Sequence, residues 1–162
     1  MTSRVGVAAA TEESTAAGIY GVIVGAAVLA ASHADSATTM SAAVLVTLVV
    51  YWSAERYSRV VAERIHTGHR PSWSQLRRQL TTGWEIVTAS ALPLVVLGLV
   101  RVITGDLTRA VVSALVCSTV LLCLAGWEIG RSGQLSGPER AVSAVVAGGF
   151  GILMITLKAV LH

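Results

Sequence analysis

The chain has 162 residues, of which 54% are hydrophobic and only 13% are charged, and its formal net charge is +3. A soluble domain carries about 25% charged residues, so this composition excludes an ordinary soluble fold and predicts a membrane protein. Nucleic-acid binding is also disfavoured, because the arginines flank apolar stretches and form no solvated basic face.

Five apolar segments are long enough, or nearly so, to cross a bilayer, which takes about 20 mostly apolar residues. We place these spans at about residues 17–34, 39–57, 84–103, 110–127 and 140–161. Lipid cannot satisfy unpaired backbone groups, and the runs are too long and too uniformly apolar for barrel strands, so each span is expected to be a helix. The sequence therefore predicts an all-α polytopic membrane protein, a bundle of five transmembrane helices in a single domain over residues 1–162.

The segment before the first span contains one arginine, Arg4, and two acids, Glu12 and Glu13. A cleaved signal peptide begins instead with a basic, acid-poor stretch. The small residues near Ala31 leave cleavage open as the alternative, but we expect this segment to remain as a span.

Small residues in the first and fifth spans follow a spacing that lets membrane helices approach closely. The first span contains Gly21-x-x-x-Gly25, and in the fifth span Ser143, Ala147 and Gly151 lie four residues apart. We expect Gly21, Gly25, Ala147 and Gly151 at helix contacts, within the bundle or between subunits of a homo-oligomer.

The second span is expected to continue into a basic amphipathic connection at residues 58–82. Ala54, Tyr57, Val61 and Ile65 recur there at helical spacing, with arginines off this stripe. A basic helix with one apolar stripe usually lies on an anionic membrane surface, so membrane lipids are the expected partner and docking of a protein is the alternative. The candidate lipid-binding residues are Arg56, Arg59, Arg64, Arg77 and Arg78.

The distribution of arginines also predicts which ends of the spans face the cytoplasm. The stretch from Ser53 to Gly83 carries six arginines, the first connection has none, and the stretches 101–109 and 131–140 carry two each. By the positive-inside rule the long connection and the N-terminus are cytoplasmic. We therefore expect a multi-pass protein of the bacterial plasma membrane with its C-terminus outside, although the orientation of the last span is less strongly determined.

The tetrapeptide Gly-Trp-Glu-Ile occurs twice, at residues 83–86 and 126–129. The first copy begins the third span and the second copy ends the fourth, so a duplicated hairpin does not explain the repeat. The predicted topology puts both copies at the cytoplasmic interface, where tryptophan belts are expected. Pro93, in the middle of the third span, is expected to kink that helix.

Three glutamates stand at this predicted depth, each close to a tryptophan: Glu55, Glu85 and Glu128. They are either interfacial acids in an aromatic belt or a converging cluster that binds a cation or a proton. Desolvation and mutual repulsion raise the pKa of carboxyl groups near a membrane, which suits them to bind and release protons. Against this stands the absence of an acid at mid-span, where the coupling site of a transporter is expected.

The sequence shows no nucleophile and base pair, phosphate loop or metal-ligand cluster, so we expect neither an enzyme nor a cofactor or metal. Cys117 and Cys123 share one apolar run and are interpreted as packing residues. His66 and His69 are interpreted as loop histidines, because no third metal ligand accompanies them.

The runs 19–24 (IYGVIV) and 51–57 (YWSAERY) resemble the N-terminal third of a family of uncharacterised small multi-pass membrane proteins of high-GC bacteria. The resemblance implies a bacterial membrane protein and no catalytic residue. It marks four positions for testing, namely Tyr20, Trp52, Glu55 and Tyr57. Two functions remain open: a small ion or proton channel or transporter, and a non-transporting scaffold or accessory subunit that docks lipid or a partner through its arginine-rich segment.

Overall fold

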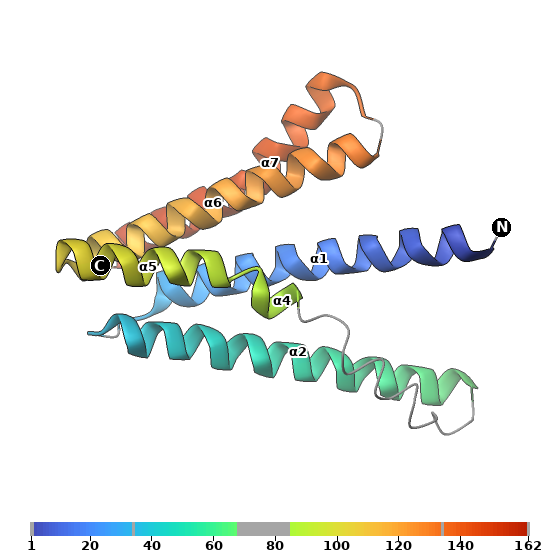
Figure 1. The fold of residues 1–162 in the computed structure, drawn as a ribbon, viewed down its shortest axis with the longest axis horizontal. Coiled ribbons are helices and arrows are strands. Elements are labelled where there is room, and N and C mark those ends of the chain that lie inside the picture. The colour runs from blue at the N-terminus through green and yellow to red at the C-terminus, as the bar shows by residue number, and fades with distance from the viewer. Residues whose placement is uncertain (1, 34, 68–84, 134, 162) are drawn as a thin grey trace.

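The part of the chain that the structure describes folds into α-helices without strands, as the hydropathy predicted. The computed structural model describes residues 2–33, 35–67, 85–133 and 135–161 (Figure 1). The helices of this part of the chain are α1 (Thr2–Ala31), α2 (Ala37–Thr67), α4 (Glu85–Thr88), α5 (Ala91–Thr104), α6 (Leu107–Ser132) and α7 (Gly137–Leu161).

Four helical stretches are long and apolar enough to cross a membrane. They are Ala37–Ala62 of α2, Glu85–Thr104 formed by α4 and α5 together, Leu107–Ser132 and Gly137–Val160. The apolar part of α1, Thr15–Ala31, is shorter. By length and composition the chain is therefore a candidate multi-pass integral membrane protein, and the predicted first span falls on the short apolar part of α1.

Helix α1 lies in the middle of the bundle. It packs against α2 and α4 on one side and against α6 and α7 on the other, while α5 packs on α6. The α1–α2 turn, the α5–α6 turn and the C-terminus gather at one end, which we call the C-terminal end of the bundle (Figure 1). The N-terminus, the end of α2 and the α6–α7 turn lie toward the opposite end.

Helices α6 and α7 form an antiparallel hairpin whose contact is made by small residues. A Cβ added to Gly126 would stand 2.7 Å from the carbonyl oxygen of Ser143 and 2.8 Å from the Cβ of Ala147, and one added to Gly151 would collide with Thr119. The Ser143 hydroxyl donates to the Gly126 carbonyl at 2.9 Å. Ala147 and Gly151, expected at a helix contact, thus lie at one within the chain, where small side chains permit close approach.

The third apolar stretch is interrupted at Ala89 and Ser90, between α4 and α5. Pro93 is the third residue of α5, and since proline has no N–H it cannot bond to the Ala89 carbonyl one turn earlier. The kink expected at Pro93 is thus a break between two helices. The Ser90 hydroxyl donates across to the Gly21 carbonyl of α1 at 2.9 Å, which ties the break to the central helix.

Gly21 and Gly25 lie where α1 meets this broken helix. A Cβ at Gly21 would overlap the backbone of Ile86 in α4, and a Cβ at Gly25 would stand 2.8 Å from the Ser90 hydroxyl oxygen. Both glycines therefore make contacts within the chain, and they let α4 lie close enough to α1 for Ile86 to be fully buried.

Candidate functional site

The inner face of α2 changes from apolar to charged along its length. Met40, Val44 and Leu48 follow one another at intervals of four residues and are 3%, 1% and 0% exposed. Trp52 packs against the same core, and Arg56, the next position on this face, is only 5% exposed. Residues four apart lie above one another on a helix, so the buried stripe of α2 ends in a guanidinium.

Two residues of the apolar stripe that was expected to lie on the membrane surface are exposed, whereas Val61 is half-buried and the side chain of Ile65 lies outside the described residues. Tyr57 is 72% exposed, and Ala54 is exposed as well. Arg56, expected to bind lipid, is among the buried residues instead. The side chains of Arg59 and Arg64 lie outside the described residues, as do Arg77, Arg78 and the rest of residues 68–84.

Glu85 is the first residue of α4, which packs against both α1 and α2. Its side chain is partly buried, and its Oε2 atom is fully buried with no hydrogen-bond partner among the described residues. The next residue, Ile86, is 0% exposed, which fixes the face that α4 turns toward α1 and α2. Glu85 is thus partly buried at the start of α4, with one of its two carboxylate oxygens shielded from solvent.

Glu55 stands next to Arg56 on α2 and is also partly buried. Helix α2 packs against α4, so two carboxylates and one guanidinium lie on these two neighbouring helices. We call Glu55, Arg56 and Glu85 the α2–α4 charge cluster. Two negative charges and one positive charge leave one net negative charge on these three residues.

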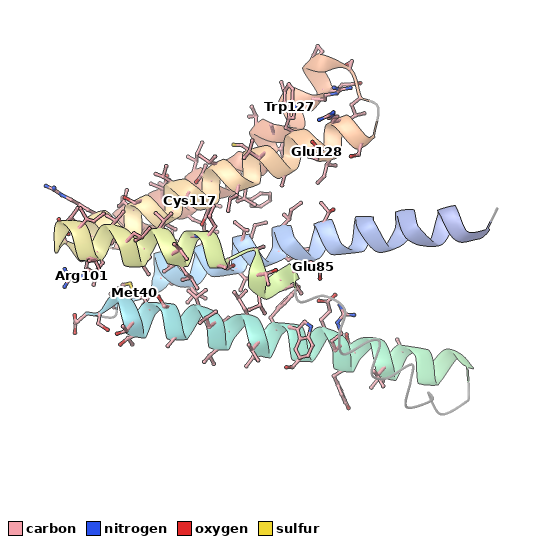
Figure 2. All side chains as sticks on the ribbon, in the orientation of Figure 1. Met40, Glu85, Arg101, Cys117, Trp127 and Glu128 are labelled. Carbon is pink, nitrogen blue, oxygen red and sulfur yellow. The ribbon has the colours of Figure 1, made fainter. Side chains whose placement is uncertain are left out.

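Glu128 lies apart from this cluster. It is near the end of α6, on the other side of α1 from Glu85, as Figure 2 shows. Its side chain is 60% exposed, and its Oε2 atom is 3.8 Å from Nη1 of Arg131. With Thr15 and Tyr20 it lines a groove of about 570 Å³ between α1 and α6. The structure therefore places two of the three glutamates on neighbouring helices and the third on another surface.

Sequence reasoning missed the inward orientation of Arg56. The available signal was its spacing of four from Trp52, Leu48, Val44 and Met40. Because Arg56 lies off the apolar stripe, it was expected to face anionic lipid, whereas in the structure Tyr57 of the stripe is exposed and Arg56 is buried. No group of three histidine, cysteine or acidic residues suitable for a metal ion occurs in the described part of the chain.

Comparison with family models, curated proteins and solved structures found no match for this chain.

Proposed function

We propose that this protein is a five-span plasma-membrane protein in which the α2–α4 charge cluster binds one monovalent cation or proton, as part of a small channel or transporter. The observation that supports this most directly is the buried Oε2 atom of Glu85, which has no hydrogen-bond partner among the described residues.

A buried polar atom without a hydrogen bond costs about 1–3 kcal/mol, and more when it is charged. A cation or a proton at Glu85 removes this cost. Because Glu85 begins the apolar stretch Glu85–Thr104 and does not lie in its middle, the cluster suits an ion-entry site better than a coupling site at mid-membrane.

The five-span topology is supported by the central place of α1. This helix contacts α2, α4, α6 and α7, all of which belong to candidate spans. A helix that is surrounded by membrane-spanning helices crosses the same part of the bilayer. Because its neighbours shield it from lipid, it can span the membrane with a shorter apolar stretch. An odd number of spans puts the termini on opposite sides, and the arginine-rich connection favours a cytoplasmic N-terminus.

The test is proton and monovalent-cation flux into liposomes containing the purified chain. Glu85→Gln and Glu55→Gln are expected to lose most of the flux. Glu128→Gln is the matched control, because it changes the same residue of the repeated tetrapeptide on another surface, and it is expected to retain the flux of the parent. Equal losses in all three variants would contradict the proposal.

A parent protein that conducts nothing would favour the scaffold function instead. The outward-facing Tyr57, 72% exposed at the start of the arginine-rich segment, supports a lipid contact there. In that case replacing Arg77 and Arg78 by glutamine is expected to weaken binding to anionic vesicles or the co-purification of a partner, and unchanged binding of both would exclude it.

A further inference from the structure

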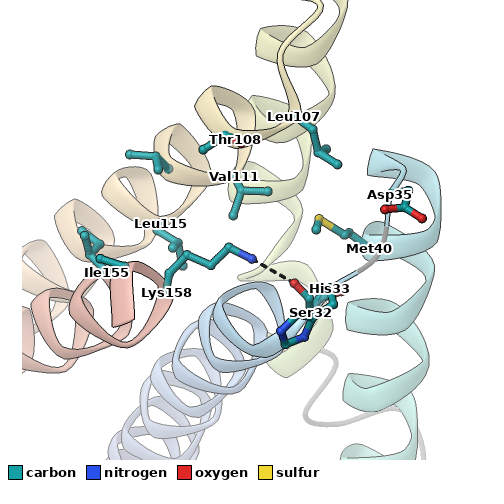
Figure 3. Close-up of a pocket in the computed structure, with 12 residues that line it drawn as sticks. Ser32, His33, Asp35, Met40, Leu107, Thr108, Val111, Leu115, Ile155 and Lys158 are labelled. Carbon is teal, nitrogen blue, oxygen red and sulfur yellow. Dashed lines mark hydrogen bonds between the residues drawn. The ribbon is translucent and has the colours of Figure 1, made fainter. Parts of the chain in front are cut away.

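A cavity of about 660 Å³ opens at the C-terminal end of the bundle, far from the α2–α4 charge cluster. Three elements enclose it: the α1–α2 turn, the first two turns of α6 and the last turns of α7 (Figure 3). Its lining combines a few polar groups with a larger apolar wall, the arrangement of a site for an amphiphilic ligand.

Lys158 of α7 reaches into this cavity. Its Nζ atom donates to the carbonyl oxygen of Ser32 at 2.9 Å, across 126 residues of sequence. Ser32 directly follows α1, so the ammonium group sits at the negative end of that helix dipole, where a cation is favoured. The fold thereby holds a positive charge at a defined point on the cavity wall.

Polarity falls along the cavity. On α6 the lining passes from Thr108, at the C-terminal end of the bundle, through Val111 to Leu115, a rise of about 10 Å along a helix. On α7 it passes from Lys158 to Ile155, about one turn further into the bundle. The polar lining groups therefore lie at the end of the bundle, beside the apolar Met40 and Leu107, whereas Val111, Leu115 and Ile155 lie deeper.

Two features of the lining bear on the ligand's charge and source. Asp35 lies at the rim and is exposed, so solvent ions screen its repulsion of an anion, whereas Lys158 is partly buried. Val112 lines the cavity and is 40% exposed on the outer surface of α6. The opening is thus continuous with the surface that faces lipid.

We propose that this cavity binds one anionic phospholipid, with its phosphate on Lys158 and an acyl chain along Val111, Leu115 and Ile155. The site is independent of the proposed cation cluster, and either stands without the other.

The proposal is tested by native mass spectrometry of the full chain in detergent, with phosphatidylglycerol, phosphatidylcholine or inorganic phosphate added. The parent is expected to retain one phosphatidylglycerol in preference to phosphatidylcholine, and free phosphate is expected not to displace it. Lys158→Gln, which loses the charge-assisted hydrogen bond, is expected to bind about tenfold more weakly. Lys158→Arg keeps the charge and is expected to restore binding. Arg109→Gln changes an exposed cation at the same end and is the control.

A second pair of variants leaves the bond between Lys158 and Ser32 in place. Ala159→Trp fills the cavity, which Ala159 lines, and is expected to exclude the lipid. Val160→Trp adds the same bulk at the next residue, which is 78% exposed and outside the lining, and is expected to bind as the parent does. Undiminished lipid retention in both Lys158→Gln and Ala159→Trp would overturn the proposal, as would equal retention of phosphatidylcholine by the parent or displacement of the lipid by free phosphate.

Discussion

The two copies of Gly-Trp-Glu-Ile share a sequence but not an environment. Ile86 of the first copy is 0% exposed, whereas Ile129 of the second is 46% exposed. Glu85 has a buried oxygen atom without a partner among the described residues, whereas Glu128 is exposed and pairs with Arg131. The tetrapeptide therefore does not set the burial of its residues, which depends on the helix face on which each residue lies.

The neighbouring helix sets this difference. Helix α4 lies against α1 at Gly21, which turns Ile86 into the core, whereas α6 uses Gly126 to approach α7 and leaves the three residues after it exposed. Residues Gly83 and Trp84 of the first copy lie outside the described residues, so the comparison rests on the glutamates and isoleucines.

The largest effect is expected from Gly21→Ala, because the new Cβ would overlap the Ile86 backbone. Overpacking of this kind costs about 3 kcal/mol of unfolding free energy or more when backbone must move. The measurement is a denaturant titration of the chain in detergent micelles. Gly98→Ala is the control, since no atom lies within 4 Å of its Cβ position, and it is expected to be neutral or slightly stabilising. Equal stability of the two variants would mean that α1 and α4 are not in contact.

The isoleucines of the two copies are expected to differ next most strongly. Ile86→Ala removes a fully buried side chain and is expected to cost about 2–4 kcal/mol. Ile129→Ala removes a half-exposed one and is expected to change the unfolding free energy by about 0.5 kcal/mol or less. The same titration measures both, and a similar loss in the two variants would contradict the different burial of the two copies.

The glutamates are expected to show a smaller and opposite effect. Glu85→Gln removes the charge from a buried oxygen without a hydrogen bond, so in buffer free of small monovalent cations it is expected to stabilise the fold by about 1 kcal/mol. Glu128→Gln is expected to stay within about 0.5 kcal/mol of the parent, because its ion pair is exposed. Destabilisation by Glu85→Gln would show that the Glu85 carboxylate is already well paired.

The smallest effect is expected from Arg131→Gln, which breaks the ion pair with Glu128. The pair is long at 3.8 Å and both side chains are more than half exposed, so the unfolding free energy should change by about 0.5 kcal/mol or less. A loss of more than about 2 kcal/mol would place Glu128 in a buried network and remove the contrast with Glu85.

Hydropathy alone predicted the all-helical fold and the apolar stretches that can cross a membrane, because lipid permits few alternatives. It also put Glu85 and Glu128 at a similar level along the bundle, and Figure 2 shows the two at similar positions along its long axis. The depth of a residue along the bundle does not determine toward which side of its helix the side chain points, however. Whether a glutamate faces another helix or the outside depends on which helix packs beside it. The helix that begins with Glu85 meets α1 at Gly21, which lies 64 residues earlier in the sequence.

The break at Ala89 and Ser90 and the cavity beside Lys158 were beyond sequence reasoning for a related reason. Pro93 indicated a disturbed helix, but the bond from Ser90 to Gly21 that holds the break depends on tertiary packing. Lys158 was visible only as a basic residue near the chain end, since its partner Ser32 lies in a distant turn.

The central claim is that Glu85, and not Glu128, is the buried acid that takes up a cation or proton. Carbodiimides that partition into apolar surroundings modify protonated carboxyl groups, and peptide mass spectrometry locates the adduct. The account predicts an adduct on Glu85, with slower labelling when a bound monovalent cation competes, and no adduct on Glu128. Equal labelling of both glutamates, or labelling of Glu128 alone, would contradict it.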